Sequence, residues 1–340
     1  MGETVPADYT KLTAWGYRWR LYSRLRAASR AWSPSGDMAR QPFPAVIQLQ
    51  TINACNAACT MCPYPLFKSR FTRGRMEDAL FEKITTEIAS HPEVDTFVPM
   101  LQNEPFLDRH ILQRVKEFKT RTGGRVAVEL VTNGAFLTED TVERIRDSGL
   151  DVLDISLDAL SPEVYRRIRH GLDYQQVLDG VNRVIDAQLP HTAVFVRLVR
   201  VRENFREVKA FARAWKAKGV QVFIYSANSR AGSLPDFDEQ LRVPEAEVAW
   251  TQRLERYAVR AYLHHCPVPF AGAAIVNNGD VLLCTQDWAR REVLGNVREQ
   301  TLAEIWNGPR MREIRGLIAR RRYSEVPSCA DCSLWRDGWF

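Results

Sequence analysis

The 340-residue chain contains no long hydrophobic run. No apolar stretch reaches the roughly 18 residues that a membrane-spanning helix needs. The N-terminus also lacks an apolar core followed by a small-residue cleavage site, which would mark a secretory signal. These absences predict a cytoplasmic protein with no membrane partner. The proportions of hydrophobic (45%) and charged (26%) residues are those of an ordinary globular protein.

Lysine is scarce: it supplies 8 of the 47 basic residues, so arginine carries most of the net charge of +6. Binding to nucleic acid usually requires basic residues on one face, often with aromatic side chains that stack on bases. One local concentration exists, the amphipathic stretch from Tyr17 to Arg26. It is either a surface or partner helix or, as we prefer, a solvated helix that packs its aromatic side chains on the fold. We therefore expect no nucleic-acid partner.

Strand-like apolar runs alternate with amphipathic helical stretches along most of the chain. The expected strands are Val46–Gln50, Val94–Leu101, Val126–Val131, Val152–Leu157, Ala193–Val201 and Val220–Tyr225. The helical patterns are Asp78–Ser90, Ile111–Arg121, Glu139–Asp147, Tyr174–Ala187 and Phe205–Lys218. Alternation of this kind is typical of βαβ units on a parallel sheet. Six strands predict an α/β fold with a partial (β/α)6 barrel of the TIM type.

The alternation stops after Gly232, which predicts three regions: a basic N-terminal extension (1–44), the barrel (45–232) and a small C-terminal domain (233–340). In the last region we expect a helix over Pro244–Ala261 and a hairpin over Ile275–Leu283. The segment that follows Cys266 is too small for a hydrophobic core of its own. Such segments usually depend on a metal or a covalent staple.

Seven cysteines in a reducing compartment indicate metal binding or catalysis rather than disulfides. Three of them, the first cysteine set, have the spacing C-x3-C-x2-C directly after the first expected strand: Cys55, Cys59 and Cys62. Three thiolates so close together can bind three irons of a 4Fe-4S cubane and leave the fourth iron open. A zinc site is the alternative, but structural zinc normally takes four protein ligands and no fourth lies nearby.

This spacing and location resemble the radical S-adenosylmethionine (radical SAM) superfamily. The resemblance implies an enzyme whose reduced cluster cleaves SAM to a 5′-deoxyadenosyl radical, which removes hydrogen from a C–H bond. It also implies an external electron donor of the flavodoxin or ferredoxin type.

Further segments resemble the SAM-binding motifs of the family, although Gln102 and Asn103 replace two glycines that commonly precede Glu104. All the segments lie at the carboxyl ends of expected strands or beside the first cysteine set, the face where barrel enzymes build their sites. Among Arg166, Arg167 and Arg169, we choose Arg169 as the carboxylate clamp. The SAM-binding residues that the resemblance implies are Met61, Glu104, Asn133, Ser156, Asp158 and Arg169.

The remaining four cysteines, the second cysteine set, are Cys266, Cys284, Cys329 and Cys332. Four thiolates can fully ligate a second 4Fe-4S cluster, although they are also a favoured set for structural zinc. Their arrangement resembles the SPASM auxiliary-cluster domain, and more closely its single-cluster form, the twitch domain. The resemblance covers approximately Val46 to Trp335.

A fully ligated second cluster has no iron open to substrate, so we expect it to transfer electrons or to hold the fold. The twitch resemblance implies dehydrogenation of a small molecule, a sugar, aminocyclitol or nucleoside of antibiotic biosynthesis. Radical-mediated decarboxylation or epimerisation of a sugar or nucleoside acid is an alternative, as is peptide maturation, which we disfavour because only residues 1–44 precede the barrel. Strand parity makes Gln48, Gln50, Glu129, Arg197 and Tyr225 candidates for the barrel interior. Glu129 and Arg197 are our choices for a catalytic role.

Overall fold

The computed structural model describes residues 43–248, 253–254, 257–258 and 265–336. The amphipathic stretch from Tyr17 to Arg26 and most of the expected N-terminal extension lie outside these residues. The expected helix over Pro244–Ala261 falls partly outside them; its first residues form a short 3-10 helix, η3 (Glu245–Glu247).

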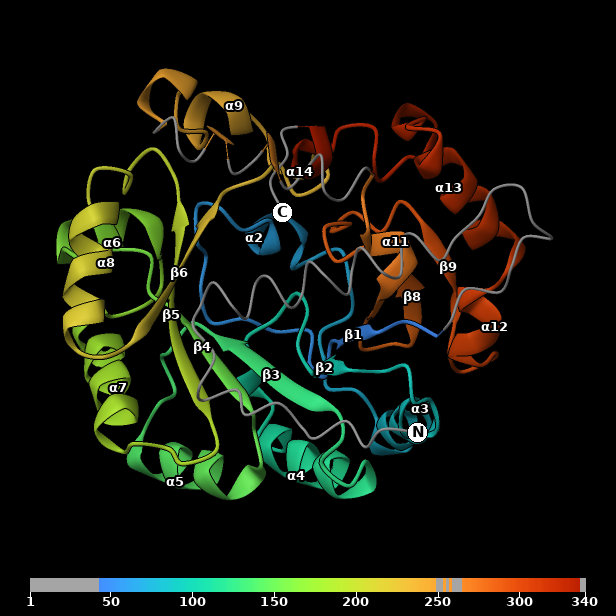
Figure 1. Cartoon of the computed structure of the whole chain (residues 1–340), viewed down its shortest axis with the longest axis horizontal. Helices are drawn as coiled ribbons and strands as arrows, with labels where there is room; N and C mark the ends of the chain where they lie inside the picture. Colours follow the sequence, from blue (N-terminus) through green and yellow to red (C-terminus); the bar gives the residue numbers. More distant parts are fainter. Residues whose placement is uncertain (1–42, 249–252, 255–256, 259–264, 337–340) are drawn as a thin grey trace.

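Six parallel strands in the sequence order β1 to β6 form the barrel part of the molecule. The strands are β1 (Val46–Leu49), β2 (Thr96–Val98), β3 (Ala127–Thr132), β4 (Val152–Ser156), β5 (Ala193–Arg200) and β6 (Gln221–Ser226). The outer helices are α3 (Asp78–Ser90), α4 (Ile111–Arg121), α5 (Glu139–Ser148), α6 (Pro162–Ile168), α7 (Tyr174–Asp186) and α8 (Val208–Ala217). Figure 1 shows these helices around the outside of the curved sheet. The expected partial (β/α)6 barrel is confirmed.

Most expected barrel elements agree with the structure to within one residue at each end, but two are four or more residues shorter than expected, and side-chain hydrogen bonds explain both differences. The second strand ends at Val98 because the chain then turns, with Leu101 N donating to Asn103 Oδ1 at 3.0 Å. Helix α8 begins three residues later than expected. The preceding turn places the buried Asn204 against β5, where its amide donates to the carbonyls of Asp158 (2.7 Å) and Val199 (2.9 Å).

The sheet does not stop at β1, because strands from the C-terminal third extend it to nine strands in the order β6-β5-β4-β3-β2-β1-β7-β8-β9. β7 (Gly272–Ile275) pairs in parallel with β1, and the expected hairpin joins β7 to β8 (Asp280–Leu282), which pairs with β9 (Val293–Asn296). One hydrophobic core runs through both parts, from Leu49 in β1 to Trp306 near the end of the chain.

The remaining elements connect and cover the sheet. The helices are α2 (Tyr64–Phe67), α9 (Phe237–Gln240), α11 (Val268–Ala271), α12 (Leu302–Trp306), α13 (Pro309–Ala319) and α14 (Ser333–Arg336), with 3-10 turns η2 (Pro105–Leu107) and η4 (Tyr323–Glu325). Helix α12 begins at a capping box in which Thr301 and Glu304 exchange side-chain and backbone hydrogen bonds.

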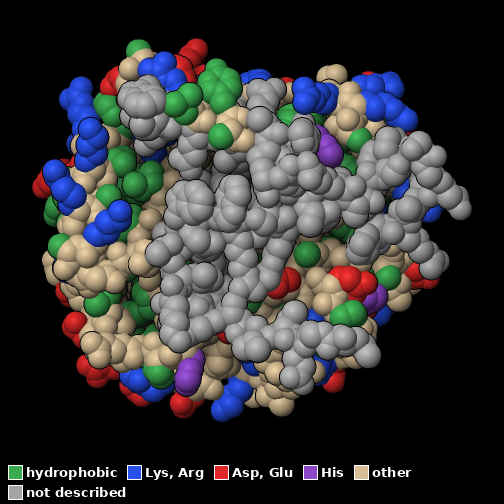
Figure 2. Space-filling model, in the orientation of Figure 1, with side chains coloured by type: hydrophobic (Ala, Val, Ile, Leu, Met, Phe, Trp, Pro, Cys, Tyr) green, Lys and Arg blue, Asp and Glu red, His purple; other side chains and the backbone are tan. Residues whose placement is uncertain are grey.

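None of the helices in the described part of the chain has the length and apolar character needed to cross a membrane. On the face shown in Figure 2, Lys and Arg side chains lie around the rim, with Asp and Glu side chains between them.

Candidate active site

The first cysteine set lies in the loop after β1, and this loop rests against the segment that follows α6. Ala58 N donates to His170 O at 2.8 Å, and Thr60 N donates to Ile168 O at 2.9 Å. Gly171 has a φ of +86°, and a Cβ there would lie 3.0 Å from Asn56 O. The backbone at this position therefore requires glycine.

The loop forms one wall of a cavity of about 400 Å³, the inner cavity. Every SAM-binding residue expected from the sequence lines it: Met61, Glu104, Asn133, Ser156, Asp158 and Arg169. It is also lined by four of the five barrel-interior candidates, Gln48, Glu129, Arg197 and Tyr225. The side chain of the fifth, Gln50, instead forms hydrogen bonds with backbone groups. It donates to Gln102 O (3.5 Å) and accepts from Asn277 N (3.3 Å).

Glu104 is a buried carboxylate between the first cysteine set and the end of β3. It accepts hydrogen bonds from Thr132 Oγ1 (2.7 Å), Asn133 N (2.8 Å) and Phe106 N (3.2 Å). Burial raises the pKa of Glu104 to about 7, because these hydrogen bonds offset only part of the desolvation. A ligand that brings an ammonium group would stabilise the charged form of this carboxylate.

The two residues that replace the expected glycines before Glu104 are accommodated without left-handed backbone, since neither has a positive φ. Gln102 reaches the C-terminal part of the chain, where its amide donates to Thr285 O (3.4 Å) and Asp287 O (3.5 Å). Asn103 lines the inner cavity, and its buried Nδ2 has no hydrogen-bond partner. The replacements thus leave one free donor at the cavity wall.

Arg169 connects the end of β4 to the first cysteine set. It forms a buried ion pair with Asp158, and its Nη1 lies 3.4 Å from Cys59 Sγ. Asp158 follows β4 with a φ of +64°, and its carboxylate also accepts from Val199 N at 2.5 Å. Arg166 and Arg167 are exposed on α6. Of the three candidate arginines, the structure brings only Arg169 to the cavity.

A row of charged and aromatic side chains crosses neighbouring strands of the barrel. Arg197 on β5 bonds through Nε to Asp154 Oδ2 on β4 at 2.9 Å, and its Nη2 lies 3.9 Å from Glu129 Oε1 on β3. Its guanidinium also lies over the ring of Tyr225 on β6, 4.7 Å from the centroid. Burial raises the pKa of Asp154 to about 6, although Arg197 opposes this shift.

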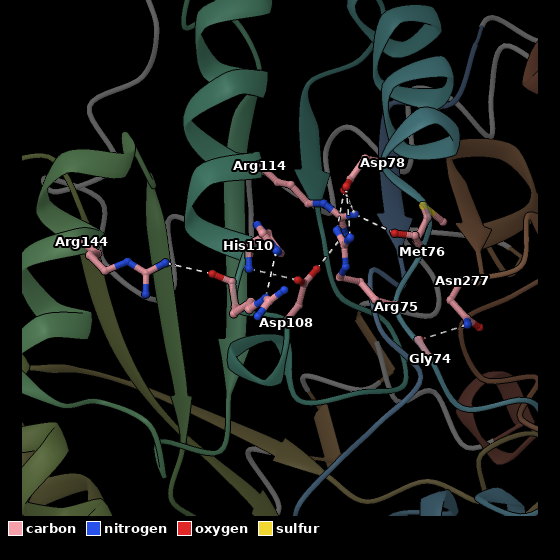
Figure 3. Close-up of polar contacts among 10 residues, drawn as sticks. Gly74, Arg75, Met76, Asp78, Asp108, His110, Arg114, Arg144 and Asn277 are labelled. Carbon is pink, nitrogen blue, oxygen red and sulfur yellow. Dashed lines mark hydrogen bonds and ion pairs between the residues drawn. The ribbon is translucent and has the colours of Figure 1, made fainter.

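Polar contacts around Arg114 hold Asp108, which directly follows the η2 turn (Figure 3); Glu104 directly precedes the same turn. The buried Arg114 donates at 2.7 Å to Asp108, to Asp78 and to the carbonyl oxygen of Met76. Nearby, Asn277 of the β7–β8 hairpin donates to Gly74 O at 3.2 Å. The network therefore joins the loop after the first cysteine set, the η2 turn and the hairpin.

The second cysteine set lines a separate cavity of about 290 Å³, the auxiliary cavity. Its four thiols come from three places in the chain, and Tyr323 and Trp335 also line it, with ring centroids 5.6 Å apart. Within the described ranges, no group of three His, Cys, Asp or Glu residues is arranged to hold a single metal ion.

Asp287 assembles the second cysteine set. This fully buried carboxylate accepts hydrogen bonds from Ser328 Oγ (2.8 Å), Glu292 N (2.9 Å) and Arg291 N (3.0 Å). It thereby ties the loop after Cys284 to the residue that precedes Cys329. The distant Cys266 is held through its N–H, which donates to the Tyr323 hydroxyl at 3.0 Å.

Arg230 and Gln286 lie between the two cysteine sets. Arg230 lines the inner cavity and donates to Gln286 Oε1 at 3.0 Å, and Gln286 lines both cavities. Burial lowers the pKa of Arg230, while the thiols of Cys62 and Cys284 favour its charged form.

The backbone at Arg230 is left-handed (φ +49°), as it is at the next two residues. It is fixed by the start of α14, because Ser229 N donates to Ser333 Oγ (2.7 Å) and Ser333 N donates to Ser229 Oγ (3.0 Å). A strained backbone held by its surroundings is common at functional sites.

The donor sets fit iron–sulfur clusters and SAM. Burial raises the pKa of Cys55 to about 12, of Cys62 to about 11 and of Cys284 to about 12. Buried thiols of this kind become thiolates when a metal compensates the charge. The inner cavity adds a carboxylate at Glu104 and the unpartnered donor of Asn103 for a small polar ligand.

Comparison with known proteins assigns the class. The model of the radical SAM superfamily matches residues 49–220, and that of an iron–sulfur cluster-binding domain (SPASM) matches residues 266–333. The chain therefore belongs to the radical SAM superfamily and has a C-terminal SPASM region. Both matches support 4Fe-4S clusters and SAM as its cofactors.

Curated relatives that match most of the chain include the following two. A tungsten-containing aldehyde ferredoxin oxidoreductase cofactor-modifying protein of Pyrococcus furiosus is 25% identical over 85% of this chain and 87% of its own. The S-adenosyl-L-methionine-dependent 2-deoxy-scyllo-inosamine dehydrogenase of Niallia circulans is 21% identical over 85% of this chain and 92% of its own. GTP 3′,8-cyclases also match, over 52–57% of their own length.

Solved structures that share the fold include BtrN and SuiB. BtrN in complex with AdoMet and 2-DOIA covers 86% of this chain and 93% of its own, with a TM-score of 0.59 and 19% identity. SuiB of Streptococcus suis bound to the precursor peptide SuiA covers 94% of this chain and 74% of its own, with a TM-score of 0.66 and 14% identity.

Sequence patterns missed four functional candidates: Asp154, Asp287, Arg230 and Gln286. The sequence did contain a signal for Asp154, because Asp154, Ser156 and Asp158 occupy alternate positions along β4 and the residues that follow it. The others lie in irregular segments, where no periodicity indicates which way a side chain points.

Proposed function

We propose that this radical SAM enzyme is an oxidoreductase that dehydrogenates a small molecule, a sugar, aminocyclitol or nucleoside. The observation that carries the proposal is the position of the inner cavity. Its wall includes the first cysteine set, the charged row of Glu129 and Arg197, and Gln286, which also lines the auxiliary cavity. A substrate on the charged row would lie between the two cysteine sets.

The chain's own residues orient the substrate and remove a proton. Arg197, fixed by Asp154, presents its guanidinium to a substrate hydroxyl, and the ring of Tyr225 supports that guanidinium. Glu129 accepts the proton that the hydroxyl loses on oxidation. Held at the first cysteine set and Glu104, SAM and its cluster would supply the radical chemistry that removes one hydrogen atom, and a cluster at the second cysteine set would accept the remaining electron.

The first cysteine set would hold the SAM-binding 4Fe-4S cluster, and the second would hold another with all four irons ligated. The match of residues 266–333 to an iron–sulfur cluster-binding domain supports a cluster over a single zinc ion at the auxiliary cavity. SAM would be bound by Glu104, Asn133, Asp158 and Arg169, together with Met61 and Ser156. A flavodoxin-type or ferredoxin-type protein would supply the electron that starts each cycle.

The test is incubation of reconstituted enzyme, SAM and dithionite with candidate aminocyclitols, sugar nucleotides and nucleoside acids. Dehydrogenation removes the mass of two hydrogen atoms from the substrate. Loss of the mass of carbon dioxide would instead show decarboxylation, and unchanged mass with deuterium uptake would show epimerisation. Modification of a peptide alone would overturn the small-molecule proposal.

A further inference from the structure

One member of the first cysteine set, Cys55, lines a cavity on each side of the cysteine loop. Cys55, Ala57 and Tyr64 line the inner cavity and also a second one of about 420 Å³, the outer cavity. The wall between the two cavities is therefore the cysteine loop itself.

The floor of the outer cavity consists of small residues. Ala57, Ala58 and Gly171 line it, and the close approach of Gly171 to Asn56 O leaves no room for a side chain at residue 171. A partner surface could therefore come close to Cys55. Electron transfer requires such an approach, because its rate falls steeply with distance.

The charge around the outer cavity has one sign. Lys68 and Arg73 line it, both are exposed, and neither forms an ion pair within the described ranges, while no Asp or Glu is among the lining residues. The adjacent Arg70 is exposed too, with its guanidinium over the Phe67 ring. By contrast, Arg75 in the same loop is paired with Asp78 at 2.5 Å.

An apolar side chain accompanies these cations. Leu66 on α2 is 48% exposed, one of few large hydrophobic residues so exposed in the described part of the chain. We call Leu66, Lys68, Arg70 and Arg73 the basic rim. Cations that lack an acidic partner on their own chain are complementary to an acidic protein surface, and Leu66 adds apolar contact area beside them.

We propose that the outer cavity and its basic rim dock an acidic one-electron carrier protein, of the flavodoxin or ferredoxin class, which reduces the first cluster. The carrier loses one electron and the cluster gains one, with no bond made or broken. The inner cavity holds SAM and substrate during the reaction, which leaves the outer side as the route for the electron. This inference rests on the proposed function.

The test compares two charge-reversed double variants of the full-length protein. Lys68→Glu/Arg73→Glu alters the basic rim, and Lys209→Glu/Arg213→Glu makes the same charge change on α8, where both residues are exposed. Binding of oxidised flavodoxin is measured by calorimetry, which needs no loaded cluster. Reduction of the reconstituted protein by reduced flavodoxin, and separately by dithionite, is followed by stopped-flow absorbance.

At low salt, the affinity of the rim variant for flavodoxin should be about tenfold or more below that of wild type. The rate at which reduced flavodoxin reduces the rim variant should fall by a similar factor. The difference should shrink as salt screens the charges. Reduction by dithionite should be unchanged, and the α8 variant should match wild type in every measurement. Lys68→Arg/Arg73→Lys should also behave as wild type.

Wild-type flavodoxin affinity in the rim variant would overturn the docking surface, as would equal losses in the rim and α8 variants. Failure of dithionite to reduce wild-type protein would count against the proposed function instead. Flavodoxin binding would still decide the docking surface in that case.

Discussion

The two cysteine sets are built in opposite ways. The first occupies one loop of eight residues after a single strand; all three cysteines line the inner cavity, and Cys55 also lines the outer one. The second collects four thiols from three distant places around one cavity and depends on contacts such as Asp287 with Ser328. A local loop can leave a metal position open for chemistry, whereas a set assembled over a long range suits a closed, fully ligated centre. Each set also has its own buried carboxylate, Glu104 beside the first and Asp287 within the second.

The largest expected contrast is between single cysteine changes in the two sets. Cys59→Ala should abolish cleavage of SAM, because only two thiolates would remain for the cluster that binds it. Cys329→Ala should leave part of this activity. The measurement is 5′-deoxyadenosine formed from SAM and dithionite. Equal and total loss in both variants would mean that the second set is needed for the fold, and the contrast would fail.

Asp287 offers a way to dismantle the second set without touching a ligand. Wild-type protein should contain about eight irons per chain after reconstitution, and Asp287→Ala should contain about four. The change leaves buried donors unsatisfied, so the free energy of unfolding should fall by about 3 kcal/mol. Asp331→Ala, an exposed aspartate beside Cys332, is the matched control. Wild-type protein with zinc and four or fewer irons would exclude a second cluster.

Glu104 should make SAM binding depend on pH at the first set. Its pKa of about 7 in the free protein lies above the ordinary value of 4.5, so the group is mostly neutral below pH 7. A neutral carboxyl cannot pair with the ammonium of SAM, so affinity should fall about tenfold per pH unit below 7 and level off above it. Calorimetry from pH 5.5 to 8.5 measures this, and Glu104→Gln should flatten the profile. The same slope in Glu104→Gln would assign the titration to another group.

The smallest expected effect concerns Arg230, which links the two sets. A cation near both favours the more negative, reduced state of each cluster. Arg230→Gln should therefore lower the reduction potentials by about 60 mV, which is tenfold in the equilibrium constant for one electron. Titration monitored by electron paramagnetic resonance measures this. The reduction potentials of Arg230→Lys should stay close to those of wild type, because the positive charge is kept. Unchanged potentials in Arg230→Gln would leave Arg230 with a structural role only.

The sequence was informative where structure is local. Buried parallel strands and amphipathic helices have periods that predict the barrel, and the carboxyl ends of its strands meet at one face. Residues such as Glu104 and Arg169 could therefore be assigned to a common site. Asp287 and Arg230 could not, because their partners are set by loops that meet only in the folded chain. The pairing of β7 with β1 was missed for the same reason.

That pairing has a consequence for how the protein is made. β1 emerges early from the ribosome, but the strand that covers its open edge, β7, follows more than 200 residues later. Until then the barrel presents unpaired backbone groups, a hazard for aggregation. A fragment ending before Gly272 would keep this hazard permanently. The C-terminal region therefore has a structural role that is separate from its cysteines, because it supplies a strand that pairs with β1.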